Sequence, residues 1–354
     1  MKAIILKQHG KPETAFEMVE MPIPIPKDGC VVIKAEVSGL NFADVLARNG
    51  LYKDAPPPPT VLGYEVVGRI YAKGKAVTDF EVGDRVVAFT RFGGYAQYAE
   101  TDARAIAKIP DDMEAAKAAA LATQYGTAYY GAYELVNLFP GDHVLIHAAA
   151  GGVGTALIQL AKAKGCIIYG TAGSDEKLEY LKNQGVDYPI NYKKHDFYEE
   201  IRKLRGKQGM DVVFDSIGGT VFKKSLKLLS YGGKIVTYGA ADRMEGKWGM
   251  LANLKLVLDY GITIPVFLLM TSKSILGLNM LRIADYKPEI IQRCIQNLVK
   301  LYSEGIINPQ IGGIFKAEEM AKAHALLESR KSIGKIVVEW DLSHESCVMS
   351  HESC

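Results

Sequence analysis

The residues best suited to chemistry in this sequence form a glycine-rich segment near the middle of the chain. Residues 148–154 read Ala-Ala-Ala-Gly-Gly-Val-Gly and lie between an apolar run and a stretch with helical periodicity. Gly151 and Gly154 let the backbone approach a pyrophosphate, and the amides that begin the following helix stabilise its charge. Ala149 replaces the first glycine of the usual motif, so the strand-turn-helix context carries the interpretation as a dinucleotide site. The predicted cofactor contacts here are Ala150, Gly151, Gly152, Val153 and Gly154.

The end of the next predicted strand indicates which dinucleotide binds. NAD-specific sites usually carry a carboxylate there, which accepts a hydrogen bond from the ribose 2′-hydroxyl. This sequence has Gly173 and Ser174 instead, which leaves room for a 2′-phosphate of about −1.5 to −2 charges. Lys177 and Tyr192 could supply a cation and a hydroxyl, although alone they would read equally well as a solvated lysine and a packing aromatic. Together with the glycine motif, the missing carboxylate and these two residues lead us to expect NADPH as the cofactor.

Two kinds of secondary structure must position these residues. Before about residue 110, short apolar runs such as 31–37 and 85–89 alternate with turn residues, which is typical of a partly closed barrel or sandwich. From about residue 125, strands alternate with amphipathic helices, which predicts a doubly wound parallel sheet. We therefore expect an α/β fold. The predicted parts are a Rossmann domain at 125–264, a second, β-rich domain at 1–124 and 265–340, and a flexible tail at 341–354.

The composition narrows the function. Among 354 residues, 42 Lys and Arg oppose 40 Asp and Glu, so no strong positive field favours nucleic acid. The five cysteines are scattered without a CxxC pair, which argues against a secreted disulfide framework and a cysteine zinc site. No targeting pattern opens the chain, and the apolar stretch 261–270 is too short to cross a bilayer. We expect a cytoplasmic protein without a transmembrane anchor.

The last residues repeat the motif Ser-His-Glu-Ser-Cys, at 343–347 and again at 350–354. We interpret this repeat as a solvated tail. Metal binding by its histidines and cysteines is the sharper alternative, but a tail offers no rigid geometry.

Segments on both sides of the glycine motif resemble a known enzyme group. The segments at 39–44 (Gly-Leu-Asn-Phe-Ala-Asp), 47–52 (Ala-Arg-Asn-Gly-Leu-Tyr) and 236–239 (Val-Thr-Tyr-Gly) are similar to zinc-free quinone oxidoreductases of the medium-chain dehydrogenase/reductase superfamily. The resemblance is closest to the vesicle amine transport protein homologue branch and runs from residue 1 to about 340. It implies that the β-rich domain is GroES-like and catalytic, and that two copies form a homodimer through their Rossmann sheets.

The sequence departs from the zinc-dependent members of this superfamily at the metal ligands. Those members use a cysteine near the position of Asn41, a Gly-His-Glu and a later cysteine, because thiolate and imidazole hold catalytic Zn²⁺. In this sequence Asn41 stands near the position of the first cysteine, and Gly63-Tyr64-Glu65 takes the place of the Gly-His-Glu. The four-cysteine structural lobe is missing. We expect no bound metal and no zinc-assisted alcohol oxidation.

Hydride transfer without a Lewis acid suits an acceptor that spreads the incoming charge by conjugation, such as a quinone or an α,β-unsaturated carbonyl. The protein then supplies positioning and a hydrogen-bond donor. The resemblance implies that Tyr52 donates a proton and that Asn41 orients cofactor or substrate, with Tyr64 as a third residue of the substrate cleft. Alternatively, both tyrosines are wall aromatics and solvent supplies the proton.

The resemblance also implies further residues near the cofactor. Thr127 would lie near the nicotinamide, although it could instead be only a helix cap. The remaining predicted contacts are Gly239, Ala240, Phe267, Leu269 and Lys335. We expect three other polar residues to be structural: Glu65 bonding Arg85 or backbone, Asp44, and His147 in the core.

These features predict a zinc-independent oxidoreductase that passes hydride from NADPH to a quinone or conjugated carbonyl. Two alternatives stay open. One is a 2-enoyl thioester or alkenal reductase, which would depend more strongly on Tyr52. The other is a cofactor-binding interaction protein with little turnover at vesicle or mitochondrial surfaces, consistent with peripheral membrane association but weakened by the near-zero net charge.

Overall fold

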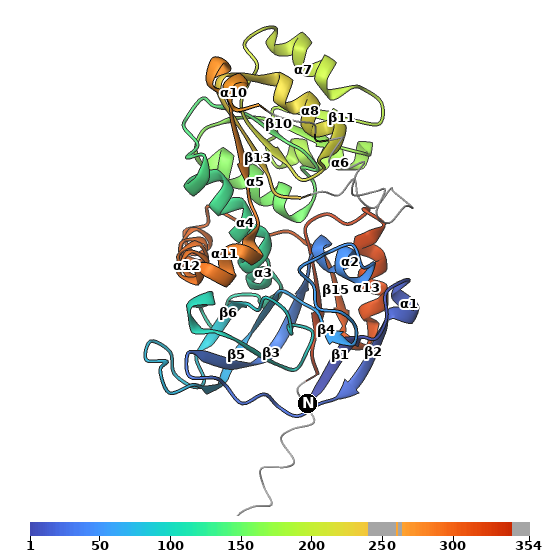
Figure 1. Cartoon of the computed structure of the whole chain (residues 1–354), viewed down its shortest axis with the longest axis vertical. Coiled ribbons are helices and arrows are strands. Elements are labelled where there is room, and N and C mark those ends of the chain that lie inside the picture. Colours follow the sequence, from blue (N-terminus) through green and yellow to red (C-terminus); the bar gives the residue numbers. More distant parts are fainter. Residues whose placement is uncertain (240–259, 261–263, 342–354) are drawn as a thin grey trace, which may run out of the picture. The chain divides into compact units, whose positions relative to one another are not determined.

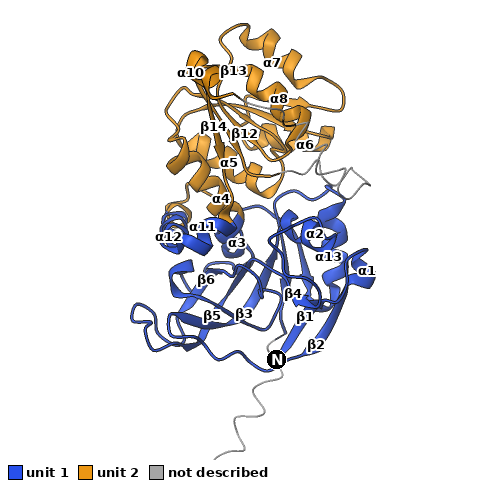
Figure 2. Ribbon diagram, viewed as in Figure 1, with its two compact units in different colours: residues 1–123, 281–300, 309–354 blue, residues 124–280, 301–308 orange. Residues whose placement is uncertain are grey.

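The structure is a computed structural model that describes residues 1–239, 260 and 264–341 (Figure 1). The predicted contact Ala240 and the repeated tail motif lie outside the described residues. The chain divides into two compact units (Figure 2), each described by itself below. Unit 1 comprises residues 1–123, 281–300 and 309–354, and unit 2 comprises residues 124–280 and 301–308.

Unit 1 is built around a β-core whose strands pair antiparallel, except for the parallel pair of β15 (Ile311–Lys316) and β16 (Lys335–Glu339). The order of its larger sheet is β15, β16, β3 (Cys30–Leu40), β5 (Glu65–Lys73), β6 (Arg85–Phe89) and β8 (Ile106–Lys108), with β7 (Tyr98–Asp102) also paired to β3. A smaller sheet has the order β2 (Phe16–Glu20), β1 (Lys2–Leu6) and β4 (Thr60–Val61). Alternate residues of β3, such as Val31, Ile33 and Ala35, are fully buried in the core, as strand periodicity requires.

Six α-helices of the described residues complete unit 1. They are α1 (Pro12–Ala15), α2 (Phe42–Arg48), α3 (Ala115–Ala120), α11 (Met280–Tyr286), α12 (Pro288–Ser303) and α13 (Met320–Glu328). Helix α2 begins directly after Asn41, whose backbone N–H donates to Asp44 Oδ2 at 2.8 Å. The second oxygen of Asp44 accepts from the Gly63 N–H at 3.2 Å. The buried Asp44 carboxyl therefore ties the start of α2 to the turn before β5, which confirms its structural role.

Unit 2 is a doubly wound parallel sheet, which confirms the predicted α/β class. Its strand order is β11 (Tyr188–Asn191), β10 (Ile167–Ala172), β9 (His143–Ile146), β12 (Met210–Asp215), β13 (Leu229–Thr237) and β14 (Ser274–Gly277). Its helices are α4 (Gly126–Tyr129), α5 (Gly152–Ala163), α6 (Asp175–Asn183), α7 (Phe197–Arg205), α8 (Gly219–Leu228) and α10 (Pro265–Thr271). A wider π-helical turn at Tyr130–Leu135 follows α4, and another at Leu121–Tyr125 spans the boundary between the units. The strand order reverses at β9, and ligands of such sheets bind beyond the carboxyl ends of the strands at that point.

One predicted boundary needs correction. We placed residues 265–280 in the β-rich domain, but β14 pairs in parallel with β13 through the register Lys234↔Ser274 to Thr237↔Gly277. Unit 2 therefore continues to residue 280, and it also includes residues 301–308, which we placed in the β-rich domain as well. Across the described part of the chain, no helix combines the length and apolar character needed to cross a membrane.

Candidate active site

The glycine segment forms the turn between β9 and α5, at the point where the sheet reverses. Gly151 is the N-cap of α5, so the amides of the first helical turn have no partner within the helix. A Cβ atom on Gly154 would lie 2.5 Å from the Ala148 carbonyl oxygen and 2.6 Å from that of Ala149. Only glycine allows helix and strand to pack so closely. The predicted strand-turn-helix arrangement is present, and it suits a pyrophosphate.

Two residues of unit 2 lie before this turn in the chain. A Cβ atom on Gly152 would lie 2.1 Å from the side chain of Gln124, which is buried. No sequence signal predicted Gln124, because its contact depends on packing between α5 and the preceding π-helical turn. Thr127 is buried within α4, whose N-cap is Tyr125, so the alternative that Thr127 is only a helix cap is wrong.

The predicted 2′-phosphate residues lie in the segments that follow β10 and β11, where Tyr192 approaches Gly173. Ser174 caps α6, with its Oγ accepting from the Lys177 N–H at 3.3 Å. Burial lowers the pKa of the Lys177 ammonium. The Tyr192 hydroxyl lies 2.6 Å from the position that a Cβ on Gly173 would take, and Lys193 Cε lies 3.4 Å from it. A side chain at position 173 would therefore displace the tyrosine hydroxyl, and Lys193 is an additional cation that we did not predict.

The remaining predicted contacts of unit 2 are less closely grouped. A Cβ on Gly239 would lie 2.7 Å from the Ser216 carbonyl oxygen, and the Gly239 carbonyl accepts from the Tyr260 hydroxyl at 3.2 Å. The Phe267 and Leu269 side chains are 50% and 79% exposed on α10. The contacts of Gly239, Phe267 and Leu269 with the cofactor stay predictions.

His147 lies in the core of unit 2, as predicted. Its Nε2 is 2.8 Å from Ser225 Oγ and its Nδ1 is 3.2 Å from Thr171 Oγ1. Burial lowers the pKa of the imidazole to about 3. A neutral ring with both nitrogens occupied is a structural residue rather than a general base.

Unit 1 contains a buried polar cluster of Asn41, Glu65 and Lys335. The Asn41 amide donates to Glu65 Oε1 at 2.8 Å, and its oxygen accepts from Lys335 Nζ at 3.1 Å. Lys335 also donates to Glu65 and, at 3.0 Å, to the Leu40 carbonyl. Glu65 Oε2 accepts from the Thr123 N–H at 3.0 Å. Both the nitrogen and the oxygen of the Asn41 side-chain amide are therefore hydrogen-bonded, which fixes its orientation.

The electrostatics of this cluster follow from its burial. Glu65 and Lys335 both have 0% exposed side chains, and burial lowers the pKa of Lys335 while Glu65 opposes the shift. Burial raises the pKa of Asp44 to about 7. A fully buried ammonium with three protein acceptors leads us to interpret Lys335 as a residue that positions Asn41. Of the two partners predicted for Glu65, Arg85 is wrong, because it binds Glu36 at 2.7 Å, and backbone is confirmed by the Thr123 N–H.

Two tyrosines stand close together in unit 1. The Tyr52 and Tyr64 rings meet edge to face at 6.4 Å between centroids, and Tyr64 lies 5.3 Å from Phe92. Burial, aided by Asp54, raises the pKa of Tyr52 to about 12. Tyr64 is 1% exposed, and its hydroxyl finds no hydrogen-bond partner among the described residues. A buried donor without an acceptor is costly, so the Tyr64 hydroxyl is suited to a ligand oxygen.

Comparisons with known proteins agree with this architecture. Residues 27–111 match the alcohol dehydrogenase GroES-like domain, and residues 152–296 match the zinc-binding dehydrogenase family. The rat synaptic vesicle membrane protein VAT-1 homolog is 36% identical over 317 residues, which cover 89% of this chain and 78% of the relative. The match over 27–111 confirms that the β-rich domain is GroES-like.

Solved structures give the same picture. Escherichia coli quinone oxidoreductase complexed with NADPH superposes with a TM-score of 0.82 at 27% identity, over 96% of this chain and 100% of that one. CurK enoyl reductase superposes with a TM-score of 0.80 at 28% identity, over 96% and 99% of the two chains.

The zinc ion that one of these family descriptions implies does not fit the residues present. The Asn41 amide is bonded to Glu65 and Lys335, so an ammonium already balances the one carboxylate of the cluster. Tyr64 offers a protonated phenol where zinc requires thiolate or imidazole. Within the described ranges, no three His, Cys, Asp or Glu side chains are grouped to hold a metal ion.

Proposed function

Because this chain belongs to the medium-chain dehydrogenase/reductase superfamily, close to the VAT-1 homologues and quinone oxidoreductases, we propose that it transfers hydride from NADPH to a quinone or conjugated carbonyl. The observation that carries this proposal is the pairing of the glycine turn before α5 with the approach of Tyr192 to Gly173. The first arrangement suits a pyrophosphate, and the second suits a 2′-phosphate. The Escherichia coli quinone oxidoreductase structure, which contains NADPH, supports the assignment.

The residues of unit 2 bind and orient the cofactor. The amides at the start of α5 hold the pyrophosphate, while Lys177 and Tyr192 hold the 2′-phosphate. Lys177→Ala is expected to weaken NADPH by about 1 to 3 kcal/mol with little effect on NADH. Lys182→Ala, on the same helix and paired with Glu179, is the matched control. Equal affinity of the wild-type protein for NADPH and NADH in a fluorescence titration would contradict the assignment.

The residues of unit 1 act on the acceptor. When bound, NADPH supplies a hydride, and a quinone that gains this hydride and one proton leaves as hydroquinone together with NADP⁺. Glu65 and Lys335 orient the Asn41 amide, and the Tyr64 hydroxyl donates to the oxygen that becomes negative. Tyr52, protonated at neutral pH, can donate the proton.

A second candidate is a 2-enoyl thioester or alkenal reductase. It is supported by the likeness to CurK enoyl reductase, and it gives Tyr52 a specific role, because saturating an enal requires protonation of carbon. Tyr52→Phe, assayed on a quinone and on an enal, separates the two. A loss confined to the enal favours the reductase, and an equal loss on both counts against a special role of Tyr52 there. If the protein binds NADPH but reduces no acceptor, the result would favour the third hypothesis, a cofactor-binding interaction protein with little turnover.

We also propose that two copies pair through unit 2. Strand β14 ends the described sheet, and α10 before it carries exposed apolar residues, with Val266, Leu269 and Met270 at 55%, 79% and 78% exposure. An unpaired edge beside an apolar helix is suited to a second copy of the same strand. Leu269→Glu should give a monomer in light scattering, whereas Val82→Glu in unit 1 should not. A wild-type monomer at micromolar concentration would contradict the proposal.

A further inference from the structure

A carboxylate lies next to the groups that we assign to the 2′-phosphate. Asp175 is the first residue of α6 and directly follows the cap Ser174. In NAD-specific sites an acid in this part of the fold accepts hydrogen bonds from the ribose hydroxyls. A free carboxylate here would also repel a phosphate of about −1.5 to −2 charges. Its presence raises the question of how the site can prefer NADPH.

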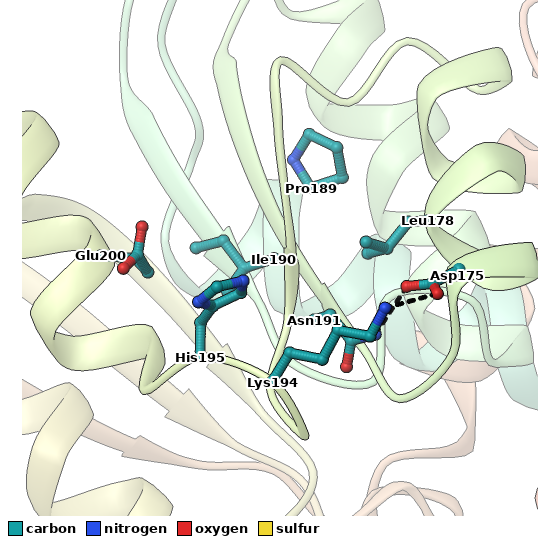
Figure 3. A pocket seen from close by; sticks show the side chains of 8 residues that line it. All are labelled: Asp175, Leu178, Pro189, Ile190, Asn191, Lys194, His195 and Glu200. Carbon is teal, nitrogen blue, oxygen red and sulfur yellow. Dashed lines mark hydrogen bonds and ion pairs between the residues drawn. The ribbon is translucent and has the colours of Figure 1, made fainter.

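In the structure, each carboxylate oxygen of Asp175 accepts a hydrogen bond (Figure 3). Its Oδ1 accepts from Asn191 Nδ2 at 3.0 Å, and its Oδ2 accepts from Lys194 Nζ at 2.6 Å. Lys194 and then Asn191 lower the pKa of the Asp175 carboxyl, so it stays ionised and bonded. The three side chains line a groove with Leu178 and Pro189.

The donors are placed by the turn that follows β11. Asn191 is buried at 4% exposure and pairs with Ala172 of β10 in the sheet register. Its carbonyl accepts from the Lys194 N–H at 3.1 Å, and its Oδ1 accepts from the Lys193 N–H at 3.1 Å. The asparagine thus fixes the turn that carries Lys194.

The same turn carries the phosphate-binding side. Tyr192 directly follows Asn191, and its hydroxyl covers Gly173, two residues before Asp175. Lys193 also approaches Gly173, whereas Lys194 is bonded to Asp175. Two adjacent lysines therefore have different positions, one beside the proposed phosphate site and one on the carboxylate.

We infer that Asp175, Asn191 and Lys194 form a charge clamp that sets the preference for NADPH over NADH. Asn191 and Lys194 hold the exposed Asp175 carboxylate against the turn after β11, and the charge of Lys194 offsets its repulsion of the 2′-phosphate. The inference rests on the proposed NADPH site and adds the specificity-determining residues Asp175 and Lys194 to it.

A double-mutant cycle on the full chain tests the clamp. NADPH and NADH are titrated into the wild type, Lys194→Met, Asp175→Asn and the double variant, with binding followed by nucleotide fluorescence. A unit charge several ångströms from a phosphate in a water-like dielectric changes affinity by roughly threefold to tenfold. Lys194→Met should lower the NADPH-to-NADH affinity ratio by that factor, and less so at high salt. The double variant should restore the ratio, because no carboxylate remains to be neutralised.

The experiment has one control variant and three results that would overturn the clamp. Lys203→Met removes another exposed lysine, paired with Glu200 on α7, and should leave the ratio unchanged. If Lys194→Met leaves the ratio unchanged while the wild type prefers NADPH, the clamp is wrong and the proposed function stands. If Lys194→Met lowers the ratio and adding Asp175→Asn does not restore it, Lys194 contacts the phosphate itself. That result also overturns the clamp. A wild type that binds neither nucleotide overturns the proposed function and the clamp together.

Discussion

Replacing Lys335 by methionine removes the only ammonium in the buried polar cluster. Glu65 would then keep two donors, the Asn41 amide at 2.8 Å and the Thr123 N–H at 3.0 Å, but no counter-charge. Since both charged side chains are 0% exposed, water cannot compensate without opening the core. Breaking a buried ion pair by removing one partner typically costs about 3 to 5 kcal/mol.

Thermal unfolding of the variant measures this cost. For a unit of this size, each kcal/mol corresponds to a shift of about 2 to 4 °C, so Lys335→Met should lower the melting temperature by roughly 6 to 20 °C. Glu65→Gln combined with Lys335→Met should recover most of the loss, because the double variant leaves no uncompensated charge. Lys7→Met, which breaks an exposed pair with Glu17, is the control and should cost less than about 1 kcal/mol. A Lys335→Met protein that melts like this control would refute the reasoning.

Three further predictions concern single groups. Tyr64→Phe should leave the melting temperature unchanged or raise it, because the hydroxyl has no partner among the described residues, while kcat/KM for a quinone falls about tenfold or more; unchanged kinetics would contradict this. Gly154→Ala should abolish NADPH binding or unfold unit 2, since its Cβ would lie 2.5 Å from the Ala148 oxygen. A nucleotide titration measures the binding and circular dichroism measures the folding; a folded variant that binds NADPH normally would contradict this. His147 has a folded pKa of about 3, so only the unfolded state gains its proton as pH falls below about 6.5. Relative to His147→Gln, the wild type should therefore lose about 2 kcal/mol by about pH 5 in urea unfolding; a pH-independent difference would contradict this.

Much of the fold could be predicted because its signals are local. The glycine turn, the Ser174 cap and the alternation of strands and helices in unit 2 depend on neighbouring residues, and the structure contains each of them. Strand β14 could not be assigned to unit 2 in this way. A short apolar run carries no mark of its partner, and its pairing with β13 is decided by the parallel sheet.

The site shows the same limit more sharply. Asn41, Tyr52 and Tyr64 were predicted from residue type and resemblance, but the ion pair that fixes Asn41 joins residues 270 positions apart in the chain. Asp175 lies three residues beyond the end of β10, and its partner Lys194 is 19 residues away in the chain, so the sequence did not predict their contact. Polar contacts between distant segments require the three-dimensional structure, since nothing in the local sequence marks a carboxylate as occupied.

The most direct test of the central claim is the oxidation of NADPH, followed by absorbance, with ortho-naphthoquinone or para-benzoquinone as acceptor. We predict enzyme-dependent oxidation that yields one hydroquinone per NADPH, persists in the presence of a metal chelator, and proceeds with a lower kcat/KM when NADH replaces NADPH. A protein that binds NADPH but oxidises it with neither quinone, or only after zinc is added, would contradict the account.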